Sequence, residues 1–255
     1  MLVRGGAVAG GLIAALMVFF AAPASAASPF ENWAAVVVAG DSQAHSGGPT
    51  EAFDNARRDV AASLVKRMGF SADNLRTFST RPRLYADKPG ASALPEIYEG
   101  LRSLAARASG GCLIYFTSHG APTGVVLGDN ILAPGVMSRL LDSACPDRPA
   151  IVVISACFSG VFIPALATSH RMILTAARPD RTSFGCGESD RYPYFDACFL
   201  SSAPEARDFL TLGAAVKDCV ARKETETGAR PPSEPQMWVG AALRPMLPLY
   251  GFSPG

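Results

Sequence analysis

An imidazole and a thiol follow two apolar, β-branched stretches of this 255-residue chain, and side by side they could carry out nucleophilic chemistry. The segment 114–118 leads into His119, and the segment 151–156 leads into Cys157. Such stretches are typical of buried parallel strands, and open α/β sheets bind their ligands outside the carboxyl ends of the strands. If the two strands are neighbours, His119 and Cys157 lie together as a proton-transfer partner and a nucleophile.

Each residue taken alone has a more ordinary interpretation. A single cysteine after a strand is most often a small buried hydrophobe, and a single histidine at a strand end most often makes a structural hydrogen bond. Their joint placement, each before a small-residue turn, favours catalysis. Ser159 is a weaker nucleophile, because Cys157 occupies the first glycine position of a G-x-S-x-G motif.

The rest of the chain alternates strand and helix patterns, which is typical of one α/β domain. Apolar runs predict further strands over residues 33–40, 75–80, 172–177 and 237–242, with a small hairpin over 125–132. Apolar residues at helical spacing predict helices over 53–68, 94–104, 136–141 and 209–220. Residues 178–193 are expected to form a loop rich in glycine and charge.

The first 26 residues have the pattern of a secretory signal peptide. Arg4 supplies a positive charge, residues 8–20 are apolar, and residues 24–26 read Ala-Ser-Ala, a small-residue cleavage site. We expect cleavage after Ala26, export to the periplasm or the medium, and a single mature domain over 27–255. The alternative is an uncleaved segment that anchors the chain in a membrane, because the apolar stretch approaches spanning length.

The chain has six cysteines, which an exported protein can pair as disulfides. Cys112 and Cys145 precede the strands that lead to His119 and Cys157, so we expect them to pair at the opposite sheet edge. A disulfide between Cys198 and Cys219 is a weaker expectation. The cysteines show no C-x-x-C spacing, which disfavours a structural zinc site, and no metal or other cofactor is expected.

The formal net charge of +1 gives no reason to expect a nucleic-acid partner. Two further residues could lie near the expected site. His45 follows the first strand in a glycine-rich loop and has either a structural role or a place in a substrate pocket. Cys186, in the loop after the strand next to Cys157, is either a disulfide partner or a free thiol near the pocket.

The strand ends resemble those of the legumain-like cysteine peptidases, relatives of the caspases. The resemblance rests on His-Gly after one strand, Ala-Cys-x-Ser-Gly after the next, and Thr-Ala-Ala at 175–177 after the third. It spans residues 33–242 and suggests an exported member of bacterial type. It implies a caspase-like three-layer α/β/α sandwich, with a mostly parallel sheet of about six strands and helices on both faces.

The resemblance also implies roles for individual residues. His119 matches the catalytic histidine, Cys157 the nucleophile, and Gly120 the glycine whose N–H forms the oxyanion hole with that of Cys157. An adjacent imidazolium lowers the pKa of a thiol and maintains the attacking thiolate. Each oxyanion donor supplies about 10²–10³ in rate. The implied function is cleavage of peptides or proteins through an acyl-enzyme.

The substrate pocket departs from the family pattern. Legumains have Glu directly before the Ala-Cys pair, where this chain has Ser155, and an Arg near residues 53–55, where this chain has none. Candidate pocket residues are Asp54, Asn55, Arg57, Arg58, Ser155 and Glu188. A preference for Asn or Asp is slightly disfavoured, because Asp54 and Glu188 could instead pair with a basic substrate side chain.

Two other functions remain open. A transpeptidase or ligase would use the same dyad and acyl-enzyme, with an amine in place of water. A non-catalytic caspase-like binding module is the third possibility, against which the intact His119 and Cys157 argue.

Overall fold

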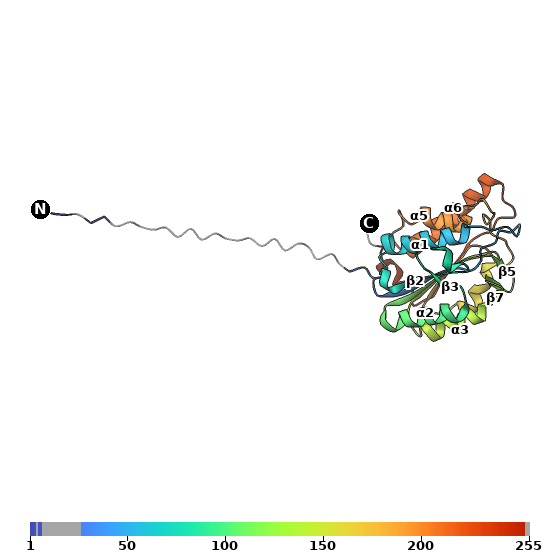
Figure 1. The fold of residues 1–255 in the computed structure, drawn as a ribbon, viewed down its shortest axis with the longest axis horizontal. Helices are drawn as coiled ribbons and strands as arrows, with labels where there is room; N and C mark the ends of the chain where they lie inside the picture. The colour runs from blue at the N-terminus through green and yellow to red at the C-terminus, as the bar shows by residue number, and fades with distance from the viewer. Residues whose placement is uncertain (4, 7–26, 253–255) are drawn as a thin grey trace.

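The computed structural model describes residues 1–3, 5–6 and 27–252 (Figure 1). Most of the predicted signal segment lies outside the described residues. Residues 27–252 form a central sheet with helices on both faces. In Figure 1, one side of the sheet is covered by helices α1 (Ala52–Met68), α5 (Tyr194–Ser202) and α6 (Phe209–Thr227). The other side is covered by α2 (Leu94–Arg107) and α3 (Pro134–Ala144).

The central sheet has seven strands in the order β10-β9-β8-β4-β1-β2-β3. Their bounds are β1 Trp33–Ala39, β2 Leu75–Ser79, β3 Gly90–Ala91, β4 Gly111–Thr117, β8 Ala150–Ser155, β9 Arg171–Thr175 and β10 Gln236–Val239. Neighbouring strands are parallel except for β10 against β9. The expected three-layer α/β/α architecture is confirmed. The count of about six strands missed β3, whose two residues carry no apolar pattern.

The four central strands β1, β4, β8 and β9 are buried along their whole length. Helices cover both faces of these strands, so each face buries its side chains, and the sequence reads as continuous apolar runs rather than as alternation. One apolar layer contains Tyr115 and Val153, and the layer on the opposite face contains Ile114 and Val152.

The helices are α1 Ala52–Met68, α2 Leu94–Arg107, α3 Pro134–Ala144, α4 Ile163–Leu166, α5 Tyr194–Ser202 and α6 Phe209–Thr227. Helix α1 ends at Gly69, whose φ of 80° is the left-handed conformation that glycine adopts without strain. Helix α6 begins with a capping box between Asp208 and Thr211. Helix α5 was missed, because its apolar residues do not gather on one face.

A second, three-stranded antiparallel sheet directly follows His119. It consists of β5 Gly120–Ala121, β6 Gly124–Leu127 and β7 Asn130–Leu132, in that order. The hairpin predicted over 125–132 is therefore confirmed and extended by β5.

Both expected disulfides are present. Cys112 pairs with Cys145, and Cys198 pairs with Cys219. Cys112 lies at the start of β4, at the sheet edge opposite His119. The first disulfide therefore links the chain at the edge of the sheet that is remote from the candidate site. Among the helices that the structure describes, none has the length and apolar character needed to cross a bilayer.

Candidate active site

Strands β4 and β8 are neighbours, and their register brings His119 and Cys157 to the same sheet edge. Thr117 at the end of β4 pairs directly with Ser155 at the end of β8. His119 and Cys157 each follow two residues after this pair. The parallel register therefore delivers both side chains at equal depth, as the sequence predicted.

The His119 ring is held by a backbone carbonyl and by an aromatic neighbour. Its Nε2 atom lies 2.9 Å from the carbonyl oxygen of Gln43. A carbonyl can only accept, so Nε2 carries the proton and donates it. Nδ1 is then the atom left to exchange a proton with a reacting group. The Phe53 ring meets the imidazole edge-on, with 5.1 Å between centroids, and fixes its plane.

The Cys157 thiol is half-buried and contacts the loop after β9. The backbone N–H of Ser183 donates to Sγ at 3.2 Å, and the Ser183 hydroxyl lies 3.6 Å from the same sulfur. These two contacts hold the sulfur against residue 183. The loop after β9 thus positions the thiol, a role that the sequence pattern did not reveal.

The turn after Cys157 has a sparsely populated backbone conformation. Phe158 has a φ of 57°, in the left-handed region that a bulky residue rarely adopts. The Phe158 N–H donates to the Arg181 carbonyl at 2.7 Å, and the Gly160 N–H donates to the Ala177 carbonyl at 2.9 Å. These bonds to the loop after β9 hold the turn in place, and such conformations cluster at active sites.

Gly120 packs closely against the chain that follows β8. A Cβ added to Gly120 would lie 2.0 Å from the Cys157 carbonyl oxygen, a separation that no side chain tolerates. Glycine at this position therefore lets the chain after His119 lie against the chain of the nucleophile. Among the described residues, the Cys157 backbone N–H is paired with no acceptor.

A buried carboxylate accepts hydrogen bonds from the last residues of both strands. Asp196 on α5 accepts hydrogen bonds from Thr117 at 2.7 Å, from Ser155 at 2.9 Å and from Tyr115 at 2.5 Å. Burial raises the pKa of the Asp196 carboxyl to about 6, although these three hydrogen bonds act to lower it. Sequence reasoning missed this residue. The signal available was an Asp inside the apolar run of residues 194–199.

A cavity of 450 Å³ contains both reactive side chains. It is lined by His45, His119, Gly120, Cys157, Phe158, Thr182, Ser183, Phe184, Gly185, Cys186, Gly187 and Asp190. Half of the lining residues lie in 182–187, in the loop after β9 where the sequence placed Cys186 near the pocket and Glu188 among the candidate pocket residues. Its one acidic side chain belongs to Asp190.

None of the six predicted pocket residues lines this cavity. Asp54 and Arg57 are buried and paired with each other, with Nε and Oδ1 2.8 Å apart. Arg57 also pairs with Asp87 at 2.5 Å. Burial opposes the charge of Arg57, but hydrogen bonds to Asp87 and Asp54 raise the pKa of the guanidinium overall. These charges stabilise α1 and the chain around it.

The other predicted pocket residues also have partners within the chain. Arg58 donates to the Asn55 side chain, and Asn55 donates to the Arg191 carbonyl at 3.1 Å. Glu188 accepts from the Ser46 hydroxyl at 2.6 Å. Ser155 donates to the buried Asp196. The contacts of Asn55 and Glu188 tie the start of α1 and the loop around residue 46 to the loop after β9.

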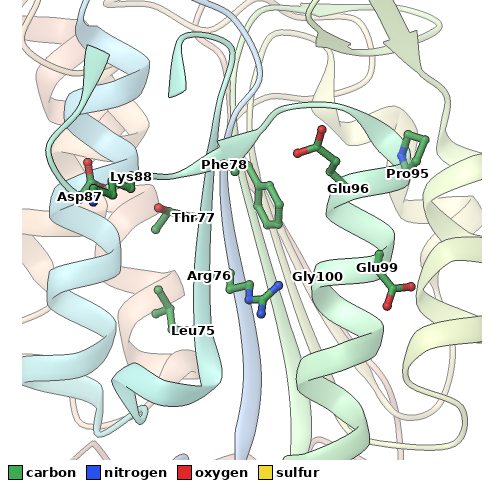
Figure 2. A pocket seen from close by; sticks show the side chains of 11 residues that line it. Leu75, Arg76, Thr77, Phe78, Asp87, Lys88, Pro95, Glu96, Glu99 and Gly100 are labelled. Atoms are coloured by element: carbon green, nitrogen blue, oxygen red, sulfur yellow. The ribbon is translucent and has the colours of Figure 1, made fainter. Parts of the chain in front are cut away.

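A larger cavity of 750 Å³ lies elsewhere, between β2, β3 and α2 (Figure 2). Phe78 projects into the space between β2 and α2, with Arg76, Glu96 and Glu99 on the same side of β2. Asp87 and Lys88 line the cavity from the other side of β2. The lining contains neither cysteine nor histidine, so it offers no nucleophile. Within the described part of the chain, no group of three or more His, Cys, Asp or Glu side chains is arranged to hold a metal ion.

Comparison with known proteins finds a matching family model and a similar solved structure. The model of the peptidase C13 family matches residues 96–240, more than half of the chain. Among solved structures, caspase-1 from Spodoptera frugiperda is similar, with a TM-score of 0.61 and 16% sequence identity, over 89% of this chain and 94% of that chain. At that identity the likeness establishes the fold. No curated protein sequence matches.

Proposed function

The chain belongs to the peptidase C13 family, the family of the legumains, and we propose that this cysteine peptidase is an endopeptidase working through His119 and Cys157. The observation that carries the proposal is the register of β4 and β8. Direct pairing of Thr117 with Ser155 brings the imidazole and the thiol into one cavity.

The reaction begins with attack by the Cys157 sulfur on the scissile carbonyl carbon. The Ser183 N–H, 3.2 Å from Sγ, holds the sulfur in place, and His119 takes up the thiol proton at Nδ1. His119 then gives this proton to the leaving amine, which departs from an acyl-enzyme on Cys157. In the second half, His119 removes a proton from water, and the resulting hydroxide releases the acid product.

The oxyanion is the second requirement of the reaction. We assign its stabilisation to the backbone N–H groups of Cys157 and Gly120. The unpaired Cys157 N–H and the tight approach of Gly120 to the Cys157 carbonyl support this assignment. Preorganised backbone donors need no reorganisation as the charge develops, which makes such stabilisation effective.

The substrate is a peptide or protein segment whose side chain enters the cavity at residues 182–190. Arg57 of α1 is buried and already paired with Asp54 and Asp87, so it offers no free positive charge to an Asn or Asp side chain. Asp190, which accepts a hydrogen bond from the Gly187 N–H at 2.7 Å, gives the cavity an acidic wall. We therefore propose that a basic residue, rather than Asn or Asp, precedes the cut.

A peptide-library digest tests this function. Cleavage by the wild type and none by Cys157→Ala is the expected result, and product masses distinguish hydrolysis from transfer to an amine. Cleavage confined to Asn or Asp would contradict the proposed specificity. Equal cleavage by wild type and Cys157→Ala would contradict the function.

We further propose that the chain is exported and that residues 27–255 form the mature domain. The A-x-A motif ending at Ala26 and the two disulfides support this, because disulfides persist in oxidising compartments. Mass spectrometry of the exported protein should give an N-terminus at Ala27. Residues 1–26 still attached would favour the membrane anchor.

A further inference from the structure

Two thiols share the cavity of the candidate active site. Among the described residues, Cys157 and Cys186 are the free cysteines, both are half-buried, and both line the 450 Å³ cavity. The other four cysteines are paired in disulfides. The mechanism proposed above uses Cys157 and gives no role to Cys186.

The loop after β9 holds the second thiol close to the first. The Ser183 N–H lies 3.2 Å from the Cys157 sulfur, and Cys186 follows only three residues later. Between them, Gly185 has a φ of 85°, and a Cβ there would lie 2.5 Å from the Tyr194 ring. The chain therefore turns at Gly185 and is packed against Tyr194, which keeps Cys186 on the cavity wall.

The surroundings give the two thiols different reactivity. Cys157 has a backbone N–H donor on sulfur and shares its cavity with His119, a base that can take up the thiol proton. Burial, together with the nearby Cys157 and acidic groups, raises the pKa of the Cys186 thiol to about 11. An oxidant therefore reacts first at Cys157, while Cys186 remains a thiol beside it.

We propose that Cys186 is a resolving thiol, which closes a Cys157–Cys186 disulfide after a peroxide has oxidised Cys157 and so switches the peptidase off reversibly. The chemistry needs only the two thiols, whereas its regulatory meaning rests on the proposed function. A resolved disulfide also protects the nucleophile from irreversible oxidation to the sulfinic and sulfonic acids.

The steps balance with hydrogen peroxide as the oxidant. The Cys157 thiolate attacks one peroxide oxygen, the O–O bond breaks, and a sulfenic acid and hydroxide form. The Cys186 sulfur then attacks the Cys157 sulfur, the S–O bond breaks, and the departing hydroxyl leaves as water with the Cys186 proton. The two thiols lose two electrons in total, and the peroxide gains them.

The test uses the full chain at low concentration, treated with a small excess of hydrogen peroxide and blocked with iodoacetamide. Mass spectrometry of unreduced peptides should find the peptides of Cys157 and Cys186 linked, and neither thiol should then alkylate. Dithiothreitol at low concentration should restore alkylation of both thiols. It should also restore activity to the level of the untreated protein. Cys157→Ser should yield no linked pair.

Cys186→Ser is the matched variant, with its activity expressed relative to its own untreated sample. After peroxide it should accumulate sulfinic and sulfonic acid at Cys157 and fail to recover on reduction. The proposal is overturned if wild type and Cys186→Ser overoxidise Cys157 equally with no linked peptide. A linked pair in a protein that cleaves no peptide would instead remove the peptidase function and leave the thiol chemistry standing.

Discussion

The Nε2 atom of His119 lies 2.9 Å from the carbonyl oxygen of Gln43. This one contact selects the tautomer, because the carbonyl accepts and therefore keeps the proton on Nε2. The loop after β1 thus orients the base through its backbone, whatever side chain stands at residue 43. Because the group that orients His119 is the backbone carbonyl of Gln43, no side-chain motif in the sequence reveals it.

Replacing the nucleophile should abolish turnover and leave the fold intact. Cys157→Ala removes one half-buried sulfur atom, so its melting temperature should stay close to that of the wild type. Cys157→Ser should be nearly inactive as well, because a serine hydroxyl is hardly ionised at neutral pH. Turnover of a fluorogenic peptide and thermal melting measure the two quantities. Retained turnover with normal melting would exclude Cys157 as the nucleophile.

Removing the imidazole should slow acylation while leaving the thiol present. His119→Ala takes away the proton donor of the leaving amine, a contribution of about 10²–10⁴ in rate. The loss should appear in kcat, with KM little changed, and iodoacetamide should still alkylate Cys157, only more slowly. Wild-type cleavage by His119→Ala would mean that the two strand ends do not work as a pair.

Gly120 should tolerate no side chain. In Gly120→Ala the new Cβ meets the Cys157 carbonyl, which is backbone and cannot rotate away, so activity and melting temperature should both fall. Gly135→Ala on α3 is the matched control. There the nearest atom is the flexible Arg139 guanidinium at 3.7 Å, and stability should stay within about 1 kcal/mol of the wild type. Equal behaviour of the two variants would refute the close approach.

The buried Asp196 should make stability depend on pH. Its pKa is raised from 3.8 to about 6 in the folded state, so the folded protein binds this proton more tightly than the unfolded chain. The resulting stabilisation is complete below pH 3.8 and is lost as the pH rises through 6, by about 3 kcal/mol in total. Asp196→Asn does not titrate and serves as the reference.

Urea unfolding of both proteins between pH 4 and 7 measures this effect. The difference in unfolding free energy, wild type minus Asp196→Asn, should decrease as the pH rises. A difference that is constant over this range would show that Asp196 does not titrate there.

The elements that position the dyad could be predicted because they are buried on both faces. Strands β4 and β8 are continuous apolar runs, and the polar residue that ends each run marks the sheet edge. The pairing of Cys112 with Cys145 followed from the same placement. By contrast, β3 is two residues long, and the apolar residues of α5 do not gather on one face, so neither has a periodicity that separates it from a loop.

The six predicted pocket residues do not line the cavity, and for Asp54 and Arg57 the physical reason is their pairing with charged side chains of the chain itself. Asp54 and Arg57 are three residues apart on α1, a spacing at which opposite charges meet on one helix face. The second partner of Arg57 is Asp87, which lies in a distant loop, so no local sequence pattern indicates this ion pair. Asp196 was missed likewise, because its three hydroxyl partners belong to strands far away in the sequence.

The order of the site along the chain has a consequence for protein synthesis. The two reactive side chains lie within residues 119–157, but the wall that holds the thiol comes from residues 182–190, and the carboxylate beneath comes from residue 196. Chains are made from the N-terminus, and domains fold as units. A growing chain therefore carries its nucleophile well before that nucleophile is positioned, so the candidate site is complete only after residue 196 has been added.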